Sequence, residues 1–337
     1  MTVSCYPSRV RLPLLMALLV LAACGDSPSV PTPPSSPPPS PPAAPSGTRF
    51  NGRLVATVTG EPIDAVDVDL GGLASRTGAD GRFSYQWSGT ATTSWLSLTA
   101  AHIVPRGLMV SATASRDITV DAIALGNGFA LDYYKQLVRN SSDAPDLLQP
   151  LRRWTKAPMI YLKTVDEAGR PIDSVTLDTV AASLADEAAA WTGARFGIAG
   201  IERGVDSRVG VPGWLTVRWP AEDQEDFCGR AQVGTEGGWM ELNYLSQFCD
   251  CLGSRMAPGI VRHELGHSMG FYHTNVRGDV MMGHFIDRSE ACGARPSARE
   301  RFHAAIAYSR PVGNYHPDND RSTTIHRGPT PTIVIVD

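Results

Sequence analysis

The sequence has a low net charge and lacks long apolar runs. The first argues against a nucleic-acid-binding protein and the second against a membrane-spanning one. The 337 residues carry a formal net charge of −4, which argues against nucleic acid as the main partner. The apolar run from Leu12 to Leu21 is too short to span a membrane. Apolar residues still make up 42% of the chain and charged residues 19%, a balance that suits globular domains with real cores.

The N-terminal segment has the features of an export signal. Arg9 and Arg11 precede the apolar run, which ends in a Leu-Ala-Ala-Cys sequence at Cys24. This ending resembles the bacterial lipobox, which implies that residues 1–23 are a signal peptide and that the Cys24 thiol receives a diacylglyceryl group. We therefore expect an exported protein, lipid-anchored to a bacterial membrane on its periplasmic or surface face. The alternative is a secretory signal cut near the same alanines.

A proline-rich linker follows over residues 24–47. Ten of the eighteen positions from 28 to 45 are proline, a composition that cannot form a core and favours extended polyproline II. At about 3.1 Å per residue this run would reach about 55 Å. We interpret it as a stalk that holds folded domains away from a lipid surface.

Residues 48–125 are predicted to form a small all-β domain. Short alternating runs separated by turn residues give about seven strands, which fits a β-sandwich. The segments 52–63 and 80–83 resemble carboxypeptidase-regulatory-like sandwiches, and that resemblance carries no catalytic residue.

A helical connector, residues 126–157, leads to a second domain over residues 158–315 and then to a loose tail over 316–337. Apolar residues at helical spacing from Leu177 to Trp191 predict a long helix in the second domain. The other predicted elements are strands at 158–165, 214–219 and 237–243 and a final helix at 297–309.

The segment from His263 to His273 carries the chemistry and reads H-E-x-x-H-x-x-G-x-x-H. On a helix that begins near Pro258, His263 and His267 lie one turn apart, so both imidazoles can bind one metal ion. Gly270 lets the chain leave the helix through a left-handed turn, which returns His273 as a third ligand. Three imidazoles and one open position predict a catalytic zinc site. The competing interpretation is a surface helix with two solvated histidines.

Glu264 lies next to the first histidine and can reach a water at the open position. We expect it to act as the general base and not as a ligand. Zinc lowers the pKa of bound water to about 7. The imidazoles must be neutral to bind the metal, so activity should fall in mild acid.

A methionine turn follows the histidines. The run Asp-Val-Met-Met-Gly at 279–283 places Met281, with Met282 as the alternative, after the extended zinc motif. The two signals together resemble the metzincin metallopeptidases, over roughly residues 158–311. The resemblance implies an α+β catalytic domain with a twisted mixed sheet, an active-site helix and a C-terminal helix, in which methionine forms an apolar floor beneath the ligands. It also implies a zinc endopeptidase acting on proteins or peptides.

Two family features are absent, and the place of one strand is open. Gly283 stands where astacin- and serralysin-type enzymes have a tyrosine, and no cysteine lies between Cys24 and Cys228 to serve as a matrixin-like latch. In metzincin-like folds the strand corresponding to 237–243 is the sheet edge beside the cleft, where a peptide could add by main-chain hydrogen bonds. The competing interpretation is an internal strand with no substrate role.

Four cysteines remain near the zinc motif: Cys228, Cys249, Cys251 and Cys292. An even number in an oxidising compartment predicts two disulfides. Cys249 and Cys251 are too close for an easy mutual bond, so each should pair with Cys228 or Cys292, in either combination. The competing interpretation is a second zinc site of four thiolates.

Two further hypotheses remain from the sequence. Asp318 and Asp320 are calcium candidates, against the competing interpretation of solvated acids. The rival function is a surface binding or adhesion lipoprotein in which the β-sandwich acts and the zinc fold is catalytically idle; the intact Glu264 argues against it.

Overall fold

The computed structural model describes residues 48–87, 93–111, 117–224, 227–251, 253–283, 288–320 and 332–336. The described residues belong to one compact unit, Ser46–Asp337. The predicted signal peptide, Cys24 and the proline-rich linker lie outside the described residues. Within the described ranges, no helix combines the length and the apolar character needed to cross a bilayer.

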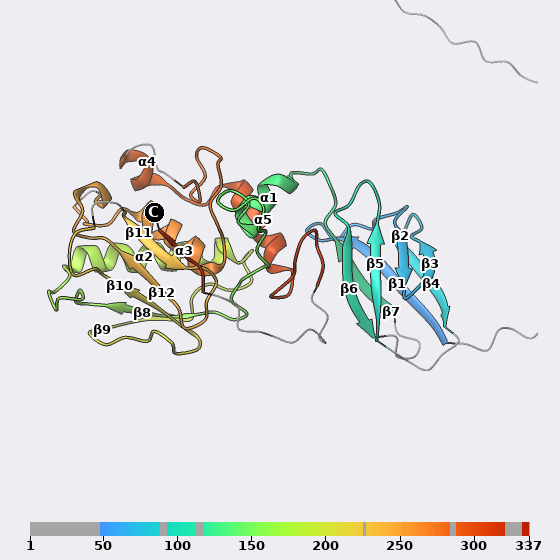
Figure 1. Ribbon diagram of the computed structural model, residues 1–337, viewed down its shortest axis with the longest axis horizontal. Helices are drawn as coiled ribbons and strands as arrows, with labels where there is room; N and C mark the ends of the chain where they lie inside the picture. Colours follow the sequence, from blue (N-terminus) through green and yellow to red (C-terminus); the bar gives the residue numbers. More distant parts are fainter. Residues whose placement is uncertain are drawn as a thin grey trace, which may run out of the picture. The chain divides into compact units, whose positions relative to one another are not determined.

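The first seven strands form two sheets (Figure 1). The three-stranded sheet has the order β4 (Arg82–Trp87), β1 (Thr48–Ala56), β7 (Asp117–Ala122). The four-stranded sheet has the order β3 (Leu73–Arg76), β2 (Asp67–Leu70), β5 (Thr93–Thr99), β6 (Arg106–Ser111). Buried side chains from both sheets share one apolar cluster, in which alternate residues of β2 are buried. This is the period-two pattern that the sequence carries.

A six-stranded mixed sheet follows. Its order is β13 (Val334–Val336), β11 (Gly229–Gln232), β12 (Trp239–Leu242), β10 (Trp214–Arg218), β8 (Met159–Lys163), β9 (Gly200–Gly204). Strands β12, β10, β8 and β9 are parallel, whereas β11 is antiparallel to both β12 and β13. The mixed α/β arrangement is compatible with a metzincin-like domain preceded by a β-rich region.

Helices complete the core. They are α1 (Leu131–Arg139), α2 (Ser174–Trp191), α3 (Pro258–Met269), α4 (Arg288–Gly293) and α5 (Ala298–Tyr308), with a 3-10 turn at Gln247–Cys249. Figure 1 shows α2 and α3 together on one side of the six-stranded sheet. The stripe from Leu177 to Trp191 is buried as the spacing predicts. At the start of α2 the Asp173 side chain accepts a hydrogen bond from the Thr176 backbone N–H, which satisfies one of the free donors of the first turn.

The strand at residues 237–243 is internal, so the interpretation of it as a sheet edge is wrong. β12 lies between β11 and β10, and Met240 and Leu242 are fully buried. Both edges of β12 are used by neighbouring strands, which leaves no main-chain groups for a substrate.

Residues 317–320 of the predicted tail, 316–337, are packed, so the prediction of a loose tail is wrong for them. The Asp318 carboxylate, 1% exposed, accepts hydrogen bonds from Arg310 Nε at 2.8 Å and Arg106 Nη1 at 3.1 Å. Asp320 bonds Arg106 Nη2 at 3.2 Å. The two carboxylates are therefore neither solvated nor grouped for calcium, because arginine side chains occupy their acceptor positions.

Both predicted disulfides form. Cys228 bonds Cys249, and Cys251 bonds Cys292. The interpretation of these four residues as a thiolate zinc site is therefore wrong, since every sulfur is used in a disulfide. The first bond holds the residue before β11, and the second ties the loop before α3 to α4.

Candidate metal centre

Helix α3 places two of the predicted ligands side by side. It begins with Pro258 in its first turn and ends at Gly270, which has a φ of 112°. The His263 and His267 rings have centroids 4.7 Å apart, and their Nε2 atoms lie 3.0 Å from each other. Two nitrogens at this separation face one point in space, as a shared metal ion requires.

The turn at Gly270 brings in the third histidine. A Cβ at this position would lie 2.0 Å from the Arg152 carbonyl oxygen, so only glycine fits here. His273 then lies with its ring centroid 5.4 Å from that of His263 and 4.9 Å from that of His267. One ligand atom from each histidine lies within 4.8 Å of the others.

Each imidazole is oriented by an acceptor on its other nitrogen. His263 Nδ1 lies 2.5 Å from the Val280 carbonyl oxygen, and His267 Nδ1 lies 2.8 Å from that of Phe271. His273 Nδ1 lies 3.2 Å from Asp143 Oδ2. An acceptor at Nδ1 holds the proton there and turns Nε2 toward the metal. The donor set therefore fits a zinc ion with three nitrogen ligands.

Glu264 is fully buried next to the first ligand. A Cβ built on Gly229 would lie 2.3 Å from Glu264 Oε1, so the backbone of β11 closely borders this carboxylate. Glycine at position 229 leaves the room that the Glu264 side chain occupies. The Glu264 carboxylate is therefore buried between α3 and the start of β11.

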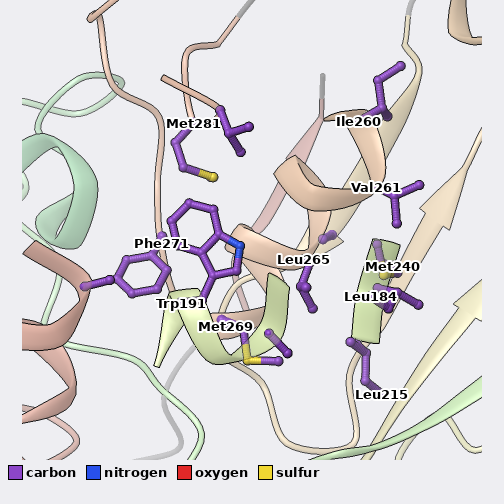
Figure 2. Close-up of a cluster of buried hydrophobic side chains, with 14 of the residues drawn as sticks. Leu184, Trp191, Leu215, Met240, Ile260, Val261, Leu265, Met269, Phe271 and Met281 are labelled. Carbon is purple, nitrogen blue, oxygen red and sulfur yellow. The ribbon is translucent and has the colours of Figure 1, made fainter. Parts of the chain in front are cut away.

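The Met turn lies directly against α3. Met281 is fully buried, and a Cβ on Gly266 would lie 2.3 Å from its sulfur. Figure 2 shows the Met281 sulfur beside the indole ring of Trp191, in the apolar cluster that includes Leu265. Met282, the alternative from the sequence, is partly exposed and lines a cavity instead.

A buried carboxylate that we did not predict holds this turn. Glu300 Oε1 accepts a hydrogen bond from the Met281 backbone N–H at 2.7 Å, and its Oε2 accepts from the Ser297 N–H at 2.6 Å. Burial, followed by the nearby Asp279, raises the pKa of Glu300 to about 7. Asp279 itself accepts a hydrogen bond from the Tyr133 hydroxyl at 2.6 Å. The Ser-x-x-Glu spacing at 297–300 is a capping-box signal, but nothing in it points to the Met turn.

Other residues of the site also escaped the sequence interpretation. Asp143 lies 130 positions before His273, and no motif joins them. Gly229 and Gly266 matter because the side chains of Glu264 and Met281 approach them closely, and no sequence pattern indicates such an approach. His284, which follows Gly283, lies outside the described residues.

Part of the chain matches a known family. Residues 221–289 match the family model described as Astacin, a peptidase family. That span contains the three histidines, Glu264 and Met281, and the match supports a metzincin-type zinc metallopeptidase. It also contains Gly283, at the position where astacin-type enzymes have a tyrosine.

Comparisons with curated proteins and with solved structures add no support for a fold or a function. No curated protein matches the chain. Among solved structures, two interface mutants of a type II cohesin–X-dockerin complex from Acetivibrio cellulolyticus are similar to 23% and 22% of this chain, with identities of 26% and 23% and TM-scores of 0.19 and 0.17. This chain spans 58% and 52% of those two chains. The likeness is too low to support a fold or a function.

Proposed function

We propose that this protein is a zinc-dependent endopeptidase with Glu264 as its general base. The observation that carries the proposal is the convergence of three histidines whose Nδ1 atoms each face an acceptor. A buried glutamate follows the first of them on α3. Three imidazoles leave one position open, which is the arrangement of a catalytic site and not of a structural one.

Zinc bound at this site would polarise the scissile carbonyl group and make a nearby water acidic enough to react at neutral pH. The protein's own contribution is to hold His263, His267 and His273 in one orientation and to exclude bulk water. Glu264 takes the proton from the attacking water and delivers it to the leaving amine. Its burial between α3 and the Gly229 backbone keeps the carboxylate within reach of the reacting groups.

The decisive experiment compares the protein with its Glu264→Ala variant on a peptide library. We expect the protein to cleave, a chelator to abolish cleavage and added zinc to restore it. The variant should keep one zinc per chain and lose activity by about 10²–10⁴-fold. Glu61→Ala, an exposed change in the β-rich region, is the matched control. Equal activity of protein and Glu264→Ala would remove the proposed base, and zinc-independent cleavage would remove the metal.

The rival function, an adhesion lipoprotein with an idle zinc fold, has no observation in its favour. It would predict no loss on replacing Glu264, so the same experiment tests it.

We further propose that the protein is exported and held at a bacterial membrane by a lipid on Cys24. The support is the Leu-Ala-Ala-Cys sequence after a basic and then an apolar segment. Mass spectrometry of protein from membranes should show an acylated N-terminal Cys24. Cys24→Ser should abolish the modification, and Cys5→Ser, within the signal segment, should leave it intact. A processed but unmodified N-terminus would overturn the anchor.

A further inference from the structure

Strand β13 covers the outer edge of β11. Its residues pair antiparallel, with Val334 opposite Gln232, Ile335 opposite Ala231 and Val336 opposite Arg230. The pairing continues through Ile333, whose carbonyl oxygen accepts a hydrogen bond from the Val233 N–H at 2.9 Å. The segment 333–336 therefore uses the main-chain groups that β11 would otherwise offer to another extended chain.

The covered edge belongs to the strand that borders the metal centre. Gly229, at the start of β11, lies against Glu264, and just beyond its end the Gly234 N–H donates to the His267 carbonyl oxygen at 3.1 Å. A cavity of about 740 Å³ is lined by His273 and Gly283 together with residues 333–336. The segment thus forms a wall of the space that reaches the third ligand.

One side chain of β13 fits an apolar seat. Ile335, 9% exposed, packs with the fully buried Val233 and Tyr272, and Ile333 lies partly against the same cluster. Val334 and Val336 are 42% and 55% exposed. Main-chain pairing with alternate side chains in pockets is the general mode by which a sheet edge binds an extended peptide.

We propose that the segment 333–336 occupies the β11 edge as a tethered competitor of the peptide substrates that metzincin-like folds bind along a sheet edge, and that the seat filled by Ile335 selects a branched apolar residue on the amino side of the cleaved bond. The direction follows from the register. Val336 lies opposite Arg230, and the residue of β11 before Arg230 is Gly229, which lies beside Glu264. The catalytic part of this proposal rests on the proposed peptidase function, whereas peptide binding at the edge does not.

The first test measures binding alone. A fluorescent peptide with the sequence of residues 332–337 is titrated by anisotropy into the protein and into a chain shortened to end at Thr332, both carrying Glu264→Ala. A site occupied for nine-tenths of the time raises the apparent Kd about tenfold, so we expect the shortened chain to bind at least about tenfold more tightly. Equal binding to both chains, or binding to neither, would overturn the proposal.

A point variant tests release of the segment independently of whether the shortened chain folds. Ile335→Asp places a charge in the Val233 and Tyr272 seat and should release the segment, whereas Val312→Asp, at a position that is 51% exposed, is the matched control. The Ile335→Asp chain should bind the peptide as tightly as the shortened chain does. A peptide carrying aspartate at the position of Ile335 should bind none of them; tight binding of that peptide would overturn the role of the seat.

The second test measures cleavage with Glu264 intact. Release of the segment should lower KM about tenfold with kcat unchanged, and the added peptide should inhibit competitively. If peptide binding differs as expected but no chain cleaves any substrate, the proposed function fails and the binding site stands. If all chains cleave with the same KM, the tethered competitor is overturned and the peptidase stands.

Discussion

The zinc-site region, residues 258–283, and the C-terminal region, residues 314–320, are held differently. In the first, His263 and His267 find their acceptors at Val280 and Phe271, 17 and four positions away. In the second, Asp318 pairs with Arg106, 212 positions away. Two of the three histidines are therefore oriented by carbonyl groups of their own region, whereas Asp318 depends on a partner from a distant part of the chain.

The largest expected effect is on the second region. Asp318→Ala removes a carboxylate that contacts the buried Arg106 and Arg310 side chains. Breaking such a pair leaves buried charge with too few partners, so we expect a loss of about 3–5 kcal/mol in unfolding free energy, measured by urea denaturation. Asp132→Ala, at a side chain that is 91% exposed, is the control. A loss like that of the control would mean that ion pairs do not hold this region.

A clash inside the first region should cost less. Gly266→Ala would place a methyl group against the Met281 sulfur, and overpacking of this kind costs about 1–3 kcal/mol. Gly197→Ala, where a Cβ meets nothing within 4 Å, is the control. Thermal unfolding of the zinc-loaded protein is the measurement. An unchanged transition for Gly266→Ala would show that the Met turn is not seated on α3 as described.

The long-range contact at His273 allows a sharper comparison. Asp143→Ala removes the acceptor at His273 Nδ1, and loss of such a partner weakens metal binding about 10–100-fold. Asp146→Ala, in the same loop and exposed, is the control. Competition with a chromogenic chelator gives the zinc affinity. Equal affinities for both variants would make metal binding independent of this distant carboxylate.

The last prediction concerns the pH dependence of stability. Because the pKa of Glu300 is raised from 4.5 to about 7, the folded state keeps this proton at pH values where the unfolded chain has lost it. The contribution to stability is full below pH 4.5 and is lost as the pH rises through about 7. Glu300→Gln, which cannot ionise, should flatten the fall in unfolding free energy over this window, and Glu61→Gln should not. An identical slope in the Glu300→Gln protein would contradict the assignment.

The same contrast explains what the sequence could predict. Helix α3, the ligand spacing and the stop at Gly270 depend on local periodicity and on one backbone conformation, and the motif records both. Whether residues 237–243 form an edge strand or an internal strand depended on another strand pairing with their outer side. β11, which comes earlier in the chain, makes that pairing. Asp318 looked solvated because its Arg106 partner lies far away in sequence. Charge in a sequence carries no information about which group will neutralise it.

The contact between Asp143 and His273 has a consequence for how this fold can be divided. Trp154, which is fully buried, also donates its indole N–H to the Ser268 carbonyl oxygen at 2.8 Å. The residues between α1 and β8 therefore help to hold the zinc helix and its third histidine in place. A chimaera that joins a foreign sequence at residue 158 would keep the zinc-binding motif but lose the residues that hold it in place. A fragment that is to fold and bind zinc by itself should therefore begin upstream of α1.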